Sequence, residues 1–128
     1  MITGGVGITP MLSIIRRVFG AYEKTEVSLF YSNKTEKDIL FREELDECAK
    51  EHPQQFNLYL TLTQADTELV DWKNFTGRFD KDILSKVMPS IEDGCSEDVL
   101  ILVSGQKKMI KSAWHLCEQL GYANIWKC

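Results

Sequence analysis

The sequence has 128 residues, the size of one compact domain, and its 44% hydrophobic and 27% charged residues are typical of a globular protein. The formal net charge of −4 argues against nucleic acid as the main partner, because no basic excess is present to neutralise phosphates. No apolar run approaches the ~20 residues of a membrane-spanning helix, and the first residues do not form a signal peptide. The 4 cysteines show no C-x-x-C pair and no ligand spacing with the 2 histidines, which predicts reduced thiols and no metal site.

The amino-terminal segment predicts the end of a strand, a tight turn and a helix. Residues 1–3 are expected to end the strand, and the glycine-rich residues 4–7 turn the chain. Thr9 is the predicted N-cap of the helix and Pro10 its first residue, where a missing N–H costs nothing. The apolar side chains that follow predict a helix that is buried on most of its circumference and ends at Gly20.

The next segment predicts two strands with a helix between them. Residues 27–31 are rich in β-branched and aromatic side chains, which is typical of a strand. Residues 35–38 resemble a capping box, so a helix is expected to begin there and to end before Pro53. Residues 56–62 alternate apolar and polar side chains, which indicates a strand with one wetter face.

The second half of the chain continues the alternation. Asp80 is expected to cap a helix that closes at Pro89. The continuous apolar run of residues 99–103 predicts a central strand covered on both faces, followed by a helix and a last short strand at residues 125–126. This order predicts one α/β domain over residues 1–128, doubly wound, with a five-stranded parallel sheet and helices on both faces.

In such a sheet, ligands bind beyond the carboxyl ends of the strands, at the point where the strand order reverses. The segments expected there are residues 4–10, 31–33, 63–64 and 104–109. The glycine turn leads directly into a helix amino terminus, which favours an anion such as a pyrophosphate. The glycines match neither G-x-G-x-x-G nor a Walker loop, so taken alone they fit a structural turn equally well.

Two segments resemble a known family. Residues 4–11, Gly-Gly-Val-Gly-Ile-Thr-Pro-Met, resemble the GG(T/V)GITPM loop of cytochrome b5 reductases, flavohaemoglobins and their relatives. Residues 33–45 are similar to the N-x-TE-x-DIL-x-R-x-EL segment of cytochrome b5 reductases. Over nearly its whole length, the chain therefore resembles the NAD(P)H-binding domain of the ferredoxin-reductase superfamily, most of all that of the cytochrome b5 reductases.

The resemblance implies an activity and a set of partners. Such flavoproteins deliver a hydride from NADH or NADPH to FAD and pass electrons onward to a haem protein such as cytochrome b5. FAD is expected to be bound mainly by a flavin-binding domain outside this chain, so the isolated domain is expected to be inactive. The implied location is the cytoplasm, or the cytosolic face of the endoplasmic reticulum, with any membrane contact made through regions outside this chain.

The resemblance also implies a set of site residues at the strand ends. Ser104 is expected beside the nicotinamide as the catalytic residue, although most relatives carry Cys-Gly-Pro where this chain has Ser-Gly-Gln. The expected cofactor-binding residues are Gly4, Gly5, Val6, Gly7, Ile8, Thr9, Pro10, Tyr31, Ser32, Asn33, Thr63, Arg78, Gly105, Gln106 and Met109. Val6 lies where cytochrome b5 reductases usually carry threonine.

Two of these residues bear on the choice between NADH and NADPH. NADH-specific relatives tend to place an aspartate at the position of Thr63, where a carboxylate would repel a 2′-phosphate. Arg78 lies where those relatives are usually apolar, and its guanidinium can hold a phosphate through two hydrogen bonds. We therefore hypothesise that NADPH is accepted or preferred. The alternative is that Thr63 caps a turn and Arg78 is a solvated surface charge.

Other interpretations stay open. The domain could be a nucleotide-binding or interaction module without catalysis of its own. Lys107, Lys108 and Lys111 could assist phosphate binding, dock an acidic haem protein, or form a solvated face. The carboxylates of residues 43–47 are expected to be the solvated face of an amphipathic helix.

Overall fold

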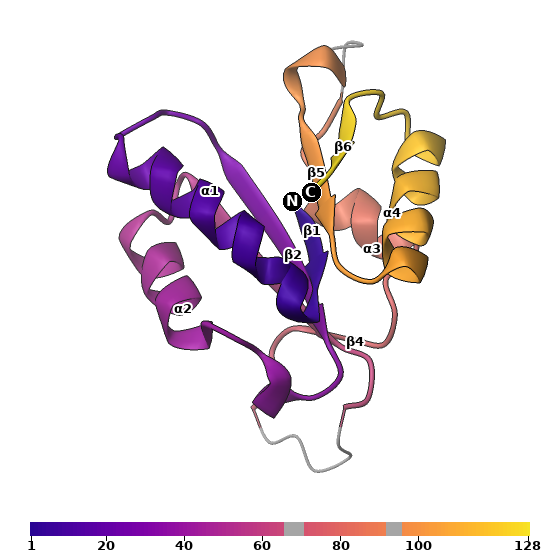
Figure 1. The fold of residues 1–128 in the computed structure, drawn as a ribbon, viewed down its shortest axis with the longest axis horizontal. Helices are drawn as coiled ribbons and strands as arrows, with labels where there is room; N and C mark the ends of the chain where they lie inside the picture. Colours follow the sequence, from indigo (N-terminus) through magenta and orange to yellow (C-terminus); the bar gives the residue numbers. More distant parts are fainter. Residues whose placement is uncertain (66–70, 92–95) are drawn as a thin grey trace.

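The computed structural model describes residues 1–65, 71–91 and 96–128. The chain forms a single parallel sheet with helices on both faces (Figure 1). The strands are β1 (Ile2–Gly4), β2 (Val27–Asn33), β3 (Phe56–Leu62), β4 (Phe75–Thr76), β5 (Ile101–Ser104) and β6 (Ile125–Lys127). The α-helices are α1 (Ile8–Gly20), α2 (Arg42–Glu51), α3 (Lys81–Val87) and α4 (Lys107–Gln119), and short 3-10 turns lie at Gly5–Gly7, Glu36–Asp38 and Ser96–Asp98.

The strand order is β4-β3-β2-β1-β5-β6, and every neighbouring pair is parallel. The chain winds outward from β1 to β4 and then returns to place β5 against the other side of β1. The reversal of strand order therefore lies between β1 and β5, where Thr3 pairs with Ser104. The α/β, doubly wound fold is confirmed, but the expected count of five strands is wrong, because the described residues form a sheet of six. The additional strand, β4, has 2 residues, too few to produce an alternating sequence pattern.

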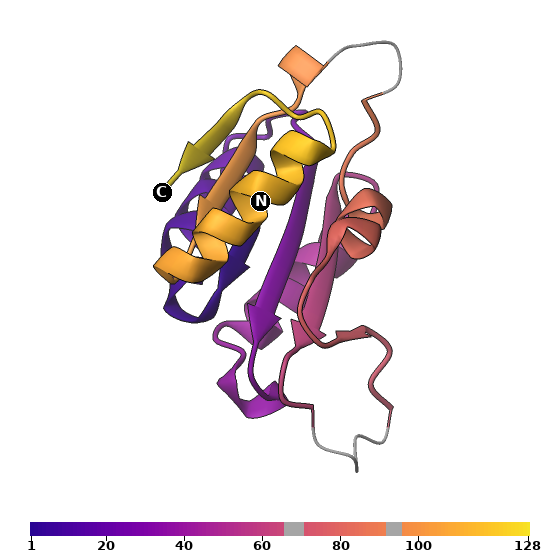
Figure 2. The same ribbon diagram turned by 90° about the vertical axis from the view of Figure 1, so that its right-hand side faces the viewer.

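The helices cover the sheet in two pairs, one pair on each face. Figure 1 shows α1 and α2 on one side, and Figure 2 looks onto the side covered by α3 and α4. One buried cluster joins α1 and α2 to side chains such as Leu29, Tyr31 and Leu60, whereas the other joins α3 and α4 to Phe30 and Val103. Successive strand residues thus point into opposite clusters, as the two-residue period of a strand requires.

The start of α1 differs from the sequence prediction. The 3-10 turn Gly5–Gly7 continues directly into the helix, so that α1 begins at Ile8 with Gly7 as its N-cap residue. Thr9 is therefore not the cap, and its Oγ1 instead donates a hydrogen bond to the Val6 carbonyl at 3.1 Å. Pro10 lies within the first turn, where its missing N–H still costs no hydrogen bond.

The burial of α1 also differs from the prediction. The fully buried side chains are Ile8, Met11, Leu12 and Ile15, and they form one face. The helix is amphipathic rather than buried on most of its circumference, because α2 covers only one of its flanks (Figure 1). The end of the helix at Gly20 is confirmed.

The capping box at residues 35–38 forms, but it does not begin the helix. The Thr35 N–H and Oγ1 both donate to the Asp38 carboxylate, at 3.1 Å and 2.8 Å, and close the 3-10 turn Glu36–Asp38. Phe41 then adopts a left-handed conformation with φ of 58°, which interrupts the helical backbone. Consequently α2 begins only at Arg42, and the prediction of one continuous helix is wrong. The predicted cap of α3 is confirmed, since Asp80 accepts a hydrogen bond from the Ile83 N–H at 2.8 Å.

The core contains a cysteine that should make stability depend on pH. Cys117 on α4 is 0% exposed, and burial raises the pKa of its thiol from 9.0 to about 11. Between these values the unfolded chain releases a proton that the folded chain keeps, so the free energy of unfolding should fall as the pH rises. We expect a loss of about 2 kcal/mol between pH 8 and pH 11, measured by urea unfolding.

A Cys117→Ala variant is the control for this prediction. It keeps a small apolar side chain in the core and removes the titrating thiol, so its stability should fall less steeply over the same pH range. Equal slopes for the two proteins would contradict the assignment of this pH dependence to Cys117.

Candidate functional site

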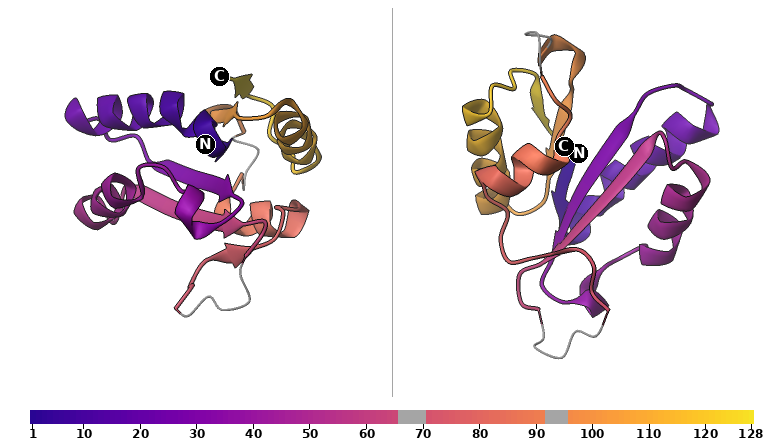
Figure 3. Two further views of the ribbon diagram at one scale, coloured as in Figure 1. Left: turned by 60° about the horizontal axis from the view of Figure 1, so that its bottom comes forward. Right: turned by 180° about the vertical axis from the view of Figure 1, so that it is seen from behind.

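All the strands are parallel, so their carboxyl ends meet at one edge of the sheet, and the left panel of Figure 3 turns this edge toward the viewer. The glycine loop, defined as residues 4–7, leaves β1 at this edge and passes straight into α1. The turn that follows β5, defined as residues 104–106, lies beside it. This pair of segments occupies the point where the strand order reverses, which is the usual ligand-binding position of doubly wound sheets.

Gly7 lies in direct contact with the turn after β5. A Cβ atom at Gly7 would be 2.8 Å from the Gly105 nitrogen, 2.8 Å from the Ser104 carbonyl carbon and 2.8 Å from Thr3 Oγ1. These separations are too short for any side chain, so glycine is required here by packing. The glycine loop and the turn after β5 therefore form one continuous backbone surface.

Met109 on α4 closes the other side of the same junction. A Cβ atom at Gly4 would lie 2.6 Å from the Met109 sulfur, and one at Gly105 would lie 3.0 Å from its terminal methyl. Gly105 also has a φ of 139°, which favours glycine. The structure thus brings together the predicted site residues Gly4, Gly7, Gly105 and Met109, although they come from three separate segments.

The amino terminus of α1 gives this surface its preference for anions. The first N–H groups of a helix have no partner within the helix, and the helix dipole adds a partial positive charge. Gly5, Val6, Thr9 and Pro10 are exposed beside these groups, and Val6 is 79% exposed. Ile8 is different, because the residue is 0% exposed and its N–H donates to the Gly5 carbonyl, so it faces the core and not a ligand.

Ser104 lies under the glycine loop. It is the last residue of β5, its side chain is on the α1 side of the sheet, and it is only 5% exposed. Beside it, Thr3 is 0% exposed and its Oγ1 has no hydrogen-bond partner among the described residues. Thr3 was not anticipated from the sequence, because a threonine in a strand carries no signal of its own. The junction therefore holds two hydroxyl groups directly below the backbone surface.

The predicted residues at the end of β2 do not all reach the surface. Tyr31 is 0% exposed, and its hydroxyl donates to the Gly5 carbonyl at 3.3 Å and accepts from the Leu40 N–H at 3.2 Å. Burial raises the pKa of this phenol, and the Leu40 N–H partly opposes that rise. Ser32 is half-buried, whereas Asn33 is 6% exposed with both amide atoms unpaired among the described residues. The Tyr31 side chain supports the glycine loop from below rather than lining the site.

Thr63 and Arg78 lie on neighbouring segments at the far side of the same edge. Thr63 follows β3, and its N–H donates to the Asn33 carbonyl at 2.9 Å. Arg78 follows β4, next to Gly77, whose N–H donates to the Leu62 carbonyl at 2.7 Å. Arg78 is exposed and forms no ion pair within residues 1–65, 71–91 and 96–128. An exposed guanidinium is thus present where two strands from the site end, and the residue that follows β3 there is Thr63 and not an aspartate.

Gln106 and the lysines that follow it surround the start of α4. Gln106 is the exposed N-cap residue of α4, and its side chain makes no capping hydrogen bond. Lys107, Lys108 and Lys111 are exposed, and none forms an ion pair within the part of the chain that the structure describes. A hollow of about 390 Å³ on this side is lined by Lys107, Ile110, Lys111, Trp114, His115, Glu118 and Lys127. This is a basic surface on an otherwise acidic chain.

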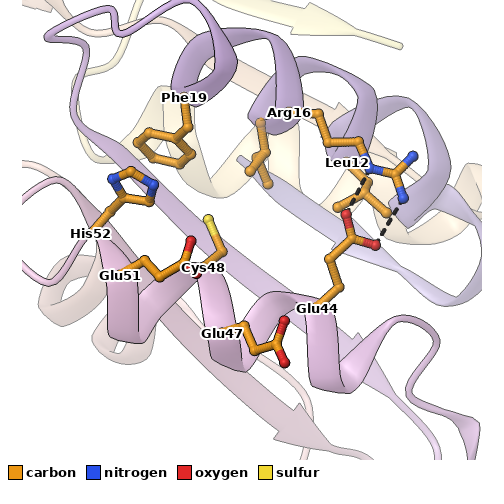
Figure 4. A pocket seen from close by; sticks show the side chains of 9 residues that line it. Leu12, Arg16, Phe19, Glu44, Glu47, Cys48, Glu51 and His52 are labelled. Carbon is orange, nitrogen blue, oxygen red and sulfur yellow. Dashed lines mark hydrogen bonds and ion pairs between the residues drawn. The ribbon is translucent and has the colours of Figure 1, made fainter.

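A second hollow of about 180 Å³ lies between α1 and α2, away from the strand ends (Figure 4). Arg16 makes two hydrogen bonds to Glu44 across it, at 2.7 Å and 2.8 Å. His52 stacks on Phe19, with ring centroids 4.3 Å apart and an interplanar angle of 10°. The one cation of this hollow, Arg16, is thus paired with Glu44, and the remaining carboxylates, Glu47 and Glu51, do not favour an anionic ligand. We therefore place the functional site at the strand ends and not in this hollow.

Metal sites and membrane-spanning helices are two further features that bear on function. Among the described residues, no group of three or more histidine, cysteine or acidic side chains could hold a metal ion. None of the described helices has the length and apolar character needed to cross a membrane.

Comparison with known proteins agrees with this fold. A family model described as the oxidoreductase NAD-binding domain matches residues 1–115. The chain belongs to this family. The resemblance inferred from the glycine loop and from residues 33–45 is thereby confirmed.

The curated relatives of this NAD-binding domain include cytochrome b5 reductases. The chain is 43% identical over 124 residues to NADH-cytochrome b5 reductase 2 of Mus musculus, a match that covers 95% of this chain and 42% of the relative. It is 38% identical over 125 residues to NADH-cytochrome b5 reductase 1 of Homo sapiens, covering 96% of this chain and 39% of the relative. The chain thus spans less than half the length of these relatives.

Solved structures give the same fold. The cytochrome b5 reductase domain of Ulva prolifera nitrate reductase has a TM-score of 0.88 and 28% identity, covering 100% of this chain and 47% of that one. The CS-b5R domains of human Ncb5or, in the NAD+ form, have a TM-score of 0.82 and 22% identity, covering 98% of this chain and 35% of that one. The NAD-binding domain of cytochrome b5 reductase-like proteins is therefore the fold that this chain adopts.

Proposed function

We propose that this domain binds NADPH or NADH at the strand ends and presents the nicotinamide to FAD in a longer flavoprotein reductase. The observation that carries the proposal is the junction at which Gly7 lies against Ser104 and Gly105, because it forms a backbone surface without side chains beside a helix amino terminus. A pyrophosphate fits this surface by charge, and a flat ring fits it by shape.

The residues of this chain bind and orient the nucleotide. The exposed N–H groups of the glycine loop hold the pyrophosphate, and the turn after β5 fixes the position of the nicotinamide. Ser104, at the end of β5, provides a hydroxyl group beside the ring, where a hydrogen bond can hold the carboxamide. FAD would be held by the flavin-binding domain and would supply the chemistry of hydride acceptance and one-electron transfer.

The nucleotide that we propose as preferred is NADPH. The names of the curated relatives specify NADH. In this chain, however, no carboxylate is present at Thr63 to repel a 2′-phosphate, and the exposed Arg78 can pair with one. The adjacency of the two residues at the ends of β3 and β4 supports this part of the proposal.

The similarity to cytochrome b5 reductases supports a proposal for the partners and the location of the parent protein. We propose a flavin-binding domain of the same parent protein as the first partner and a haem protein such as cytochrome b5 as the electron acceptor. The basic surface at the start of α4 offers an acidic acceptor a complementary charge. The proposed location is the cytoplasm, or the cytosolic face of the endoplasmic reticulum through other regions of the parent. A non-catalytic nucleotide-binding module is the second candidate, because Ser104 replaces the cysteine expected in most reductases.

A calorimetric titration of the chain with NADPH and with NADH tests the binding part of the proposal. Saturable binding of either nucleotide supports it, and tighter binding of NADPH supports the preference. The hydride-transfer part is tested in the longer protein by mixing it with NADPH without oxygen and following the loss of flavin absorbance. Nucleotide binding without any loss of absorbance would favour the non-catalytic module.

A further inference from the structure

The Tyr31 hydroxyl joins two loops at the edge of the site. It donates to the Gly5 carbonyl at 3.3 Å and accepts from the Leu40 N–H at 3.2 Å. Gly5 belongs to the glycine loop, and Leu40 belongs to the segment that joins the 3-10 turn Glu36–Asp38 to α2. The two loops are far apart in the sequence, and each forms a hydrogen bond to this one side chain of β2.

The glycine loop has little other support at Gly5. Gly5 has a φ of 54°, and no atom lies within 4 Å of the position that its Cβ would take. The next residue, Val6, is 79% exposed and so packs against little. The Gly5 carbonyl also accepts from the Ile8 N–H, which holds it within the turn. The hydroxyl of Tyr31 is therefore the contact that ties this part of the loop to the sheet.

The hydrogen bond from Tyr31 also sets the direction of an anion-binding group. The peptide between Gly5 and Val6 is planar and trans, so its C=O and N–H point in opposite directions. With the Gly5 carbonyl held toward the core by Tyr31, the Val6 N–H is turned outward, away from the sheet. Because it belongs to the first turn of a helical segment, this N–H has no partner upstream within the helix. It is thus aimed at the space in which the pyrophosphate is proposed to lie.

The state of the phenol suits this task. Tyr31 is fully buried by β1, β3 and α1, and burial raises the pKa of its hydroxyl above the ordinary value of 10.0. No ionisable side chain among the described residues hydrogen-bonds to it, and the groups that face it are the backbone groups of Gly5 and Leu40 and the neutral amide of Asn33. The phenol consequently keeps its proton and remains a donor throughout the physiological pH range.

We infer that Tyr31 is a positioning residue for nucleotide binding: its hydroxyl couples the glycine loop to the Leu40 segment and presents the Val6 N–H to the pyrophosphate. The inference rests on the proposed function, since it specifies how the same site is held. It assigns to Tyr31 a role without contact with the nucleotide, in place of the direct contact expected from the sequence.

A Tyr31→Phe variant tests the inference, because it retains the ring in the core and removes only the hydroxyl. We expect the dissociation constants of NADPH and ADP to rise about fivefold, the effect of one hydrogen bond, and that of adenosine, which has no pyrophosphate, to stay the same. Tyr59→Phe is the matched control. Tyr59 is half-buried on β3, its hydroxyl has no hydrogen-bond partner among the described residues, and its loss should leave all three constants unchanged.

Amide hydrogen exchange separates positioning from a structural role. In the unmodified chain, NADPH should slow the exchange of the Leu40 amide. Bound NADPH orders the glycine loop, and the Tyr31 hydroxyl links that loop to the Leu40 N–H. In Tyr31→Phe this amide should exchange faster and should no longer respond to NADPH. A variant that melts at a lower temperature but keeps both the affinities and the Leu40 response would overturn the inference while leaving the proposed function intact. If the unmodified chain binds neither NADPH nor ADP, the proposed function fails and the inference fails with it.

Discussion

Replacing Gly7 with alanine is expected to lower the free energy of unfolding by about 2 to 3 kcal/mol, because one methyl group must be forced into a packed junction. The new Cβ would lie 2.8 Å from each of the Gly105 nitrogen, the Ser104 carbonyl carbon and Thr3 Oγ1. Two of these atoms are backbone, so neither can rotate away. The strain can be relieved only by separating the glycine loop from the turn after β5.

The same separation should abolish dinucleotide binding. The loop and the turn after β5 are proposed to hold the pyrophosphate and the nicotinamide, and a displacement of ~1 Å between them can reduce function about a hundredfold. We expect Gly7→Ala to show no saturable binding of NADPH at concentrations that saturate the unmodified chain. Urea unfolding and calorimetric titration measure the two effects on one preparation.

Gly20→Ala is the matched control. Gly20 ends α1, and no atom lies within 4 Å of the position of its Cβ. Alanine there should leave binding unchanged and should stabilise the fold by up to about 1 kcal/mol, since it restricts the unfolded chain. If Gly7→Ala and Gly20→Ala behave alike, the glycine loop is not packed against β5 as described.

Replacing Thr63 with aspartate is expected to weaken NADPH binding by about tenfold or more, because a carboxylate would face the 2′-phosphate. NADH, which has a 2′-hydroxyl there, should bind equally well or more tightly, as the carboxylate can accept its hydrogen bond. Arg78→Ala should also weaken the binding of NADPH by about tenfold, since a charged hydrogen bond is lost. The dissociation constant of NADH should change by no more than about twofold. Dissociation constants from calorimetry give all four values.

Arg17→Ala is the control for the loss of a surface cation. Arg17 is exposed on α1 and forms no ion pair within the described ranges, so its replacement should change neither nucleotide's affinity by more than about twofold. An equal effect of Arg78→Ala on NADH and NADPH would contradict the proposed contact with the 2′-phosphate. Residues other than Arg78 would then determine the choice between NADH and NADPH.

The longer strands and helices of this fold could be predicted because their patterns extend over many residues. Residues 56–62 form β3 as expected, and Asp80 caps α3 as expected. The errors fall where a few residues decide the outcome. The two-residue strand β4 has no periodicity, and Phe41 takes a left-handed conformation that sequence propensity disfavours in a bulky residue. Tertiary contacts determine both features, and a local pattern does not contain them.

The segments of the candidate site could be predicted from the sequence, but the burial of their residues could not. The glycine loop and residues 104–106 were placed at the reversal of strand order because parallel strands bring their carboxyl ends together. The burial of Tyr31 and Ile8 was not visible, since a side chain at a strand end or helix start can point either way. Thr3 and the Leu40 N–H entered the site only through the three-dimensional packing of β1 and β2.

The location of the nucleotide is the central claim, and an NMR titration of the ¹⁵N-labelled chain with NADPH tests it most directly. The account predicts that the largest shifts occur at the backbone amides of Gly5, Val6 and Gly105, on the two segments that meet at the reversal of strand order. The amides of Cys48 and His52, in the hollow between α1 and α2, should not move. Largest shifts in that hollow, or around Trp114 and His115 on α4, with the glycine loop unchanged, would contradict the account.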